Sequence, residues 1–271
     1  MRFGFIGDIV GKVGRRLVGD YLGEVRKKYA IDCVIANGEN ASHGFGLSVS
    51  TFLELQGYGV DIFTSGNHIW DKKDIFPLLS QDDSVILRPH NYPKGVMGSG
   101  IYKGEIKEEK FAVLNLMGSF GMPQCDNAFV CAKEAVESLQ EEGIKNIIVD
   151  FHAEATSEKR AMFMMLKGKI SAILGTHTHV GTDDLEIFEG TFGVSDVGMS
   201  GARKSVIGME MQEPIEKFLT GVPNRLRIPE GKGIPSIFQM IVFELENGFC
   251  KEAFKLKALD NGEIKQTLIA F

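Results

Sequence analysis

Two histidines in the segment Gly175-Thr176-His177-Thr178-His179 have the residue type and the spacing that can bind metal. They follow the apolar run 170–174, which is typical of a strand. In an extended segment, residues i and i+2 point to the same side, whereas on a helix they would lie about 200° apart. An extended His-x-His is therefore a ready metal-binding pair, although an isolated pair can also be two polar loop residues. The other polar clusters of the chain decide between these interpretations.

Four further polar clusters also follow short apolar runs. In open α/β sheets, ligands bind beyond the carboxyl ends of the strands, so we expect all five clusters to converge on one rim. The additional candidates are Asp8 after the run 3–6, Glu39 and Asn40 after 33–36, Asn67 and His68 after 62–65, and His152 after 147–151. The regular position of the clusters supports a functional site more strongly than any single cluster does.

The donor types of these residues agree with one another. Asp8 and Glu39 supply carboxylate oxygens, Asn40 and Asn67 supply amide oxygens, and His152, His177 and His179 supply imidazole nitrogens. This mixed set, with no cysteine nearby, suits manganese, iron or zinc and argues against a thiolate site. Seven ligands exceed what one ion needs, because a catalytic ion keeps positions open. Two ions that share a bridging carboxylate would use all seven, and two ions roughly 3.5–4 Å apart are the arrangement used for in-line displacement at phosphorus.

The elements that would position these clusters alternate between strands and helices as far as Gly181. Near-helical spacing of apolar residues predicts helices over 15–29, 50–58, 71–79, 128–142 and 156–166. Short apolar runs predict strands over 3–6, 33–36, 62–65, 85–87, 100–102, 111–116, 147–151 and 170–174. This alternation implies a largely parallel sheet buried between helices.

The pattern changes after Gly181. Short alternating segments over 185–188, 191–194, 236–243 and 267–271, separated by Gly, Pro and Asn, predict antiparallel strands joined by turns. The region 221–233 is predicted to be mostly loop. The sequence contains no linker, repeat or low-complexity block, so one two-sheet domain over residues 1–271 is the simplest prediction.

The composition excludes several classes of protein. The 271 residues are 44% hydrophobic and 24% charged, which is ordinary for a globular protein. A net charge of −6 without long runs of like charge argues against an extensive nucleic-acid-binding surface. No apolar run approaches the roughly 20 residues that span a membrane, and the N-terminus does not have the pattern of a signal peptide. The four cysteines lack Cys-x-x-Cys spacing, and Cys33 lies within an apolar run, so we expect a reduced, cytoplasmic protein.

The polar clusters also carry a family resemblance. Gly7-Asp8, Gly66-Asn67-His68 and Gly175-x-His177-x-His179, in this order, resemble the calcineurin-like metallophosphoesterases. That superfamily usually has Asp-x-His where this chain has Asp8-Ile9-Val10, and Gly-Asp where it has Gly38-Glu39-Asn40.

Both departures resemble one branch, the bacterial YmdB-like phosphodiesterases. So do the longer motifs Asn37-Gly38-Glu39-Asn40, Gly66-Asn67-His68-x-Trp70-Asp71, Asp150 to Lys159, Thr176 to Val180 and Asp196-Val197-Gly198-Met199. The resemblance runs from Met1 to about Gly233, and beyond that point the chain resembles the family only in its length and in its general pattern of segments. It implies an α/β fold, a two-sheet αββα sandwich of the metallophosphoesterase type.

The resemblance also implies roles for single residues. One ion would be held by Asp8, Glu39, Asn40 and His179, and the other by Glu39, Asn67, His152 and His177, with Glu39 bridging. His68 would face the phosphate as an acid or as a transition-state stabiliser. Because the usual Asp-x-His histidine is missing, Asn40 would fill its position. We expect iron or manganese in the two sites, with zinc or magnesium as the alternatives.

The activity implied by the resemblance is hydrolysis of small phosphodiesters, with 2′,3′-cyclic nucleotides as substrates, by in-line attack of a metal-bridging hydroxide. A phosphomonoesterase such as a nucleotidase is the nearest alternative enzyme. A regulatory protein that uses the metal site to bind a nucleotide or RNA is the alternative from another class. The resemblance is also compatible with a homo-oligomer. The residues predict a phosphoester and two metal ions, but they do not identify the nucleoside.

Overall fold

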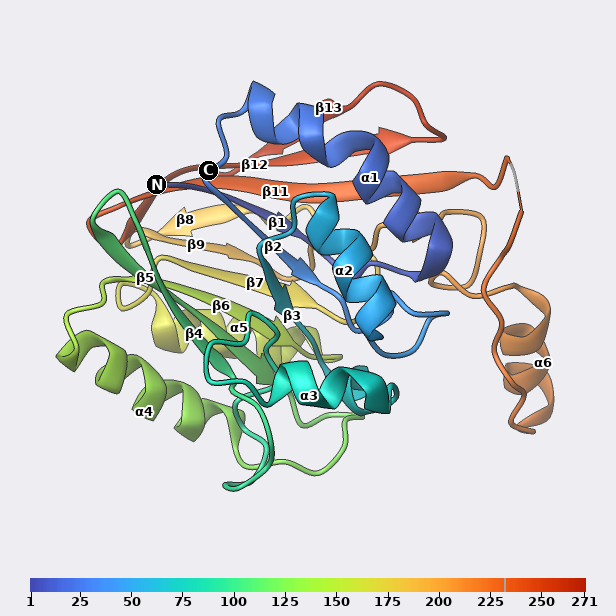
Figure 1. Ribbon diagram of the computed structural model, residues 1–271, viewed down its shortest axis with the longest axis horizontal. Helices are drawn as coiled ribbons and strands as arrows, with labels where there is room; N and C mark the ends of the chain where they lie inside the picture. Colours follow the sequence, from blue (N-terminus) through green and yellow to red (C-terminus); the bar gives the residue numbers. More distant parts are fainter. Residues whose placement is uncertain (232) are drawn as a thin grey trace.

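The computed structural model describes residues 1–231 and 233–271, in which two mixed β-sheets pack face to face and helices cover their outer faces (Figure 1). The first sheet has the strand order β13 (Lys265–Ile269), β12 (Phe249–Leu259), β11 (Ser236–Glu246), β1 (Arg2–Ile6), β2 (Cys33–Asn37) and β3 (Ile62–Thr64), and β10 (Gly201–Ala202) pairs with β11. Strands β1, β2 and β3 run parallel, whereas β11 joins β1 antiparallel.

The second sheet supplies the remaining strands. Its order is β4 (Ile101–Ile106), β5 (Glu109–Met117), β6 (Asn146–His152), β7 (Ala172–Thr176), β9 (Thr191–Val194) and β8 (Glu186–Phe188). Strands β5, β6, β7 and β9 are parallel, and the edge strands β4 and β8 pair antiparallel. The first sheet is therefore parallel at one end, over β1, β2 and β3, and the second is parallel from β5 to β9, and the metal-ligand candidates follow parallel strands of both.

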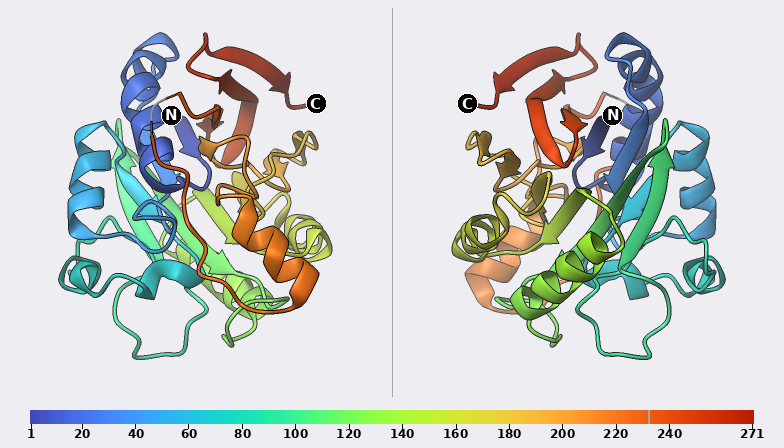
Figure 2. Two further views of the ribbon diagram at one scale, coloured as in Figure 1. Left: turned by 90° about the vertical axis from the view of Figure 1, so that its right-hand side faces the viewer. Right: turned by 90° about the vertical axis from the view of Figure 1, so that its left-hand side faces the viewer.

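The helices complete the layers of the sandwich. Helices α1 (Gly11–Lys28) and α2 (Val49–Gly57) cover the first sheet, and α4 (Ala128–Glu141) and α5 (Thr156–Leu166) cover the second (Figure 1). After β3 the chain forms two 3₁₀ turns, Asn67–Trp70 and Lys73–Ile75, and then the short α3 (Phe76–Leu79). Helix α6 (Gln212–Thr220) projects from the body of the molecule (Figures 1 and 2). Within the described residues, the helices are too short or too polar to cross a membrane.

Alternating side chains of the central strands build three apolar layers. In β2, Val34 and Ala36 pack toward α1 and α2, whereas Cys33 and Ile35 pack between the sheets. This alternation is the two-residue period of a strand that is buried on both faces. Burial raises the pKa of the Cys33 thiol to about 12, as expected for a thiol in an apolar layer.

Most predicted elements are confirmed within a few residues. Helix α1 begins at Gly11, earlier than predicted, because its glycine-rich first turn lacks the apolar repeat. Ser48 caps α2 by accepting from the Thr51 backbone N–H. Helix α5 coincides with its prediction.

Other predictions were wrong or incomplete. The helix predicted over 71–79 is a 3₁₀ turn followed by the four-residue α3. The strand predicted over 85–87 is an isolated bridge between Ile86 and Phe63. Strand β12 and helix α6 lie in parts of the chain where no strand or helix was predicted. The predicted loop over 221–233 is confirmed for its described residues, and residue 232 lies outside them.

Candidate metal centre

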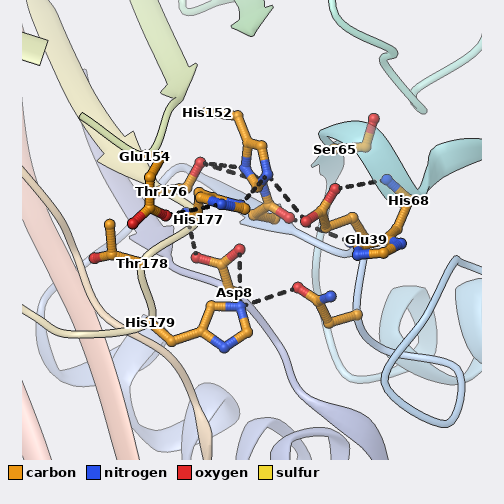
Figure 3. A network of polar contacts seen from close by, with 12 residues as sticks. Asp8, Glu39, Ser65, His68, His152, Glu154, Thr176, His177, Thr178 and His179 are labelled. Carbon is orange, nitrogen blue, oxygen red and sulfur yellow. Dashed lines mark hydrogen bonds and ion pairs between the residues drawn. The ribbon is translucent and has the colours of Figure 1, made fainter. Parts of the chain in front are cut away.

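All eight predicted site residues lie at or just after the ends of parallel strands. Figure 3 shows how Asp8, Glu39, His68, His152, His177 and His179 lie among them. They follow β1, β2 and β3 in the first sheet and end β6 or follow β7 in the second. The side chains that are buried are Asp8, Glu39, Asn40, His152 and His179, and those that are half-buried are Asn67, His68 and His177. The parallel strands of the two sheets thus bring together segments that are far apart in the sequence.

Glu39, His152 and His177 form a tight group whose potential ligand atoms all lie within 4.8 Å of one another. Glu39 Oε1 is 3.0 Å from His152 Nε2, and His177 Nδ1 is 3.1 Å from the same His152 nitrogen. The close approach of a carboxylate and two imidazoles is the donor set of a cation site with mixed oxygen and nitrogen ligands.

The partners of the opposite ring nitrogens fix how these two imidazoles point. His152 Nδ1 donates to Thr176 Oγ1 at 2.9 Å, and that hydroxyl donates to Asp150 Oδ1 at 2.7 Å. His177 Nε2 donates to Glu154 Oε2 at 3.1 Å. The remaining nitrogens, His152 Nε2 and His177 Nδ1, therefore face each other beside the Glu39 carboxylate. Such an arrangement is repulsive unless a cation or a shared proton lies between them, and outer partners of this kind are typical of metal-binding histidines.

A second group contains Asp8, Asn40 and His179. His179 Nε2 is 3.2 Å from Asn40 Oδ1 and 3.6 Å from Asp8 Oδ1. His179 Nδ1 donates to the Ile207 carbonyl at 2.7 Å, so Nε2 is the ring nitrogen that faces the two oxygens. The His177 backbone N–H donates to Asp8 Oδ2 at 3.1 Å, which ties this group to the first.

Two buried oxygens of the site have no hydrogen-bond partner among the described residues: Asp8 Oδ1 and Asn67 Oδ1. A buried oxygen without a partner costs about 1–3 kcal/mol, and more when it is charged. The site is also crowded at Gly66, because a Cβ at this position would lie 2.2 Å from His152 Nε2 and 2.5 Å from Glu39 Oε2. The orphaned oxygens and the two facing imidazole nitrogens fit metal ions better than they fit a purely structural polar cluster.

The protonation of the site also suits ligands. Burial would raise the pKa of Asp8, but His179 and His152 hold it well below its usual range. Burial and the neighbouring His152 lower the pKa of His177 to about 4, so its imidazole is neutral near pH 7. Burial would lower the pKa of His179, but Asp8 raises it to about 9. A cation that uses His179 must therefore displace a proton, as metal binding to histidine commonly does.

The backbone around His177 and His179 is strained. Their φ angles are 96° and 65°, in the left-handed region that residues other than glycine rarely adopt. Between them, Thr178 is anchored by the buried Asp196, whose Oδ2 accepts from the Thr178 N–H at 3.2 Å and from its hydroxyl at 2.8 Å. Lys159 Nζ donates to the same oxygen at 2.8 Å. A buried ion pair thus holds in place a conformation that costs of order 1–3 kcal/mol for each strained residue.

His68 lies beside the ligand groups and not within them. Its backbone N–H donates to Glu39 Oε2 at 3.1 Å, and its Nδ1 donates to Asp71 Oδ2 at 2.8 Å. The Phe45 ring meets the imidazole edge-on, with ring centroids 5.0 Å apart. Because Nδ1 is occupied by Asp71, Nε2 is the nitrogen available to a ligand, and His68 lines a cavity together with Glu39 and His177.

Two further ring side chains lie apart from the ligand groups. His43 is exposed and lines a separate depression with Arg225 and Arg227. Trp70 packs against Phe76 and Tyr92 as a core aromatic.

Two neighbours of His152 in the sequence have distinct contacts. Glu154 contacts His177 and not His152, while Asp150 reaches His152 through Thr176. Sequence reasoning missed Thr176 and the Ile207 carbonyl as orienting groups. Thr176 was detectable as the polar residue that ends β7, whereas a backbone carbonyl leaves no signal in a sequence.

Two facing mixed sheets with clustered carboxylates, amides and histidines at their strand ends define a protein of the calcineurin-like metallophosphoesterase type. The NAD nucleotidase of Haemophilus influenzae has this fold at a TM-score of 0.53 and 14% identity, over 99% of this chain and 55% of that one. At that identity the likeness concerns the fold alone.

Closer relatives define the branch. The chain matches the model of the YmdB-like protein family over residues 5–255 and belongs to this family. It is 42% identical over 233 residues to a 2′,3′-cyclic-nucleotide 2′-phosphodiesterase of Bacillus subtilis, covering 86% of this chain and 88% of that protein. The crystal structure of a novel phosphatase from Mycoplasma pneumoniae matches with a TM-score of 0.89 and 32% identity, over 96% of this chain and 93% of that one.

Proposed function

We propose that this chain is a metal-dependent phosphodiesterase that hydrolyses small cyclic phosphodiesters, with 2′,3′-cyclic nucleotides as its substrates. The observation that carries the proposal is the pair of imidazole nitrogens, His152 Nε2 and His177 Nδ1, that face each other at 3.1 Å beside Glu39. The activity named for the relative from Bacillus subtilis supports the choice of substrate.

The proposed ligand sets follow the two groups of contacts. Asp8, Glu39, Asn40 and His179 would hold one ion, and Glu39, Asn67, His152 and His177 the other. Glu39 would be shared by both sets, as a buried carboxylate that already contacts His152. Asp8 and Asn67 each contribute to their set an oxygen that has no hydrogen-bond partner among the described residues. When bound, the ions would lower the pKa of water and neutralise phosphate oxygens.

His68 is the proposed proton donor to the leaving alkoxide. Asp71 accepts from Nδ1 at 2.8 Å, which keeps the ring in one orientation with Nε2 free to face a ligand. The proton to be transferred is then held at Nε2. The hydrogen bond from the His68 backbone to Glu39 keeps this imidazole next to the ligand groups, at a fixed distance from the phosphorus they would hold.

The decisive experiment measures metal content and substrate range on the same preparation. Protein purified without chelator should contain two equivalents of metal, and it should hydrolyse 2′,3′-cyclic nucleotides in preference to 5′-nucleotides. Glu39→Gln should lose metal and turnover together, whereas Glu134→Gln, an exposed position on α4, should retain both. Full turnover by a metal-free preparation would contradict the proposal.

A phosphomonoesterase is the second candidate, because the Mycoplasma pneumoniae relative is described as a phosphatase. Preference for 5′-nucleotides in the same assay would establish it instead. Cellular function that survives in a Glu39→Gln protein without turnover would favour a regulatory, ligand-binding role. Iron or manganese as the metal, the single domain over residues 1–271, the cytoplasmic location and the homo-oligomer stay predictions from the sequence.

A further inference from the structure

A cavity of about 230 Å³ opens directly onto the proposed metal ligands. One wall contains Glu39, Asn40, His68, His177 and His179. The rest of the lining is largely apolar and includes Phe45, Ile207, Met209, Pro214, Phe218 and Leu226. A group held at the metal ligands would therefore extend from a polar wall into an apolar space.

Segments that the proposed chemistry does not use build this apolar part. Phe45 lies in the glycine-flanked loop after β2, Ile207 in the loop after β10, and Phe218 on α6. Helix α6 and the coil that follows it extend beyond the two sheets (Figure 2). Phe218 is 84% exposed although it lines the cavity, so its ring stands at the rim with one face open. An aromatic ring at that position is available for stacking on a planar ligand.

Few side chains of the lining could form hydrogen bonds to the edge of a planar ligand. Among its described residues, apart from the proposed ligands and His68, Lys217 carries the one polar side chain. A lysine offers donors but no acceptor, so it cannot match the mixed donor and acceptor pattern of a base. Stacking and apolar contact tolerate any base, because every base has a π-face.

We propose that this cavity is a nucleobase subsite that accepts all four bases by stacking and apolar contact, with Phe218 as its rim aromatic. The inference rests on the proposed phosphodiesterase function and names the part of the substrate that the metal ligands do not hold. In a 2′,3′-cyclic nucleotide one ribose separates phosphorus from the base. A phosphate at the wall of His68, His177 and His179 therefore leaves the base within the same cavity.

The test compares substrates with and without a base. The wild-type enzyme is assayed on the 2′,3′-cyclic phosphates of adenosine, guanosine, cytidine and uridine, and on methyl riboside 2′,3′-cyclic phosphate. The kcat/KM values of the four nucleotides should agree within about tenfold, because stacking does not discriminate strongly between bases. The base-free diester should be at least about fivefold poorer, the low end of the loss expected for one stacking contact.

Phe218→Ala supplies the matched variant. It should lower kcat/KM for all four nucleotides by about 5- to 10-fold, mainly through KM, and leave the base-free diester unchanged. Leu219→Ala is the control, since Leu219 is 80% exposed and is not part of the cavity lining. Both positions are exposed, and thermal unfolding verifies that both variants fold.

The outcomes separate the two proposals. If the wild type hydrolyses none of the cyclic diesters, the proposed function fails. If it hydrolyses the base-free diester as well as the nucleotides, or if Phe218→Ala affects every substrate equally, the subsite is wrong. Preference for one base by about a hundredfold or more would show hydrogen-bonded reading of that base and would also overturn the inference.

Discussion

Replacing Asp196 with asparagine tests how the strained histidine loop is held. The Asp196 carboxylate is 1% exposed and accepts from Lys159 Nζ at 2.8 Å, from both donors of Thr178, and from the Gly198 N–H at 2.8 Å. Both carboxylate oxygens face donors. An introduced amide must therefore point its own NH₂ group at one of them, whichever way it is turned.

The magnitude follows from the loss of charge. Asp196→Asn leaves the Lys159 ammonium buried without a counter-charge, and breaking a buried pair in this way costs about 3–5 kcal/mol. For a chain of this size, about 2–4 °C of melting temperature corresponds to each kcal/mol, so a fall of about 6–20 °C is expected. Lys159→Met should cost less, because Asp196 keeps the Thr178 and Gly198 donors.

The double variant separates stability from positioning. Lys159→Met with Asp196→Asn removes the uncompensated charge and should recover most of the free energy of unfolding. It should still bind metal about 10- to 100-fold more weakly than Lys159→Met alone, because the anchor between His177 and His179 is weakened. Urea unfolding and competition with a chromophoric chelator measure the two quantities. A stability of Asp196→Asn within about 0.5 kcal/mol of wild type, or full metal affinity in the double variant, would refute this reasoning.

Three further predictions concern single side chains. Glu154→Gln should weaken metal binding by about 10- to 100-fold with little change in melting temperature, because Glu154 is a half-exposed partner of His177, and chelator competition measures the loss. His68→Ala should slow cleavage of diesters with poor leaving groups by about 10²- to 10⁴-fold, and slow p-nitrophenyl esters far less, in steady-state assays at constant metal content. Burial, with Lys257 nearby, lowers the pKa of Lys255 to about 8. Above that pH the unfolded state binds more protons than the folded state, so the free energy of unfolding should rise between about pH 8 and 10. Lys255→Met should abolish this rise in urea unfolding and add about 1–3 kcal/mol at pH 7, whereas an unchanged pH profile would contradict the role of Lys255.

The sequence indicated the centre of the fold well, because strands buried on both faces appear as short apolar runs. The clusters after β1, β2, β3, β6 and β7 could be placed for this reason. Strand β12 was missed because Lys251, Lys255 and Lys257 interrupt its apolar pattern, although Lys255 is buried. Helix α6 was missed because it packs little of its surface and leaves Phe218 and Leu219 exposed.

The candidate site, like the fold, could be predicted only in part. Residue types and strand-end positions predicted which side chains meet. The contacts that orient them could not be predicted, because they join residues that tertiary structure alone brings together. The Ile207 carbonyl on His179 and the anchoring of Thr178 by Asp196 are two such contacts. The positive φ angles of His177 and His179 also depend on tertiary structure, since histidine tolerates such angles but the anchoring of Thr178 by Asp196 holds the loop in them.

The position of β1 has a consequence for the order in which the protein folds. This strand, which leads to Asp8, lies between β2 from the early chain and β11 from the late chain. The segment after it is held by Ser200, whose N–H donates to the Asp8 carbonyl at 2.9 Å. Such non-local pairing forms slowly, because the entropy cost of closing a long loop arises before the stabilising contacts between its ends have formed. We therefore expect Asp8 to reach its final position only after β11 has been synthesised, so that the nascent chain would acquire its metal ions late in folding.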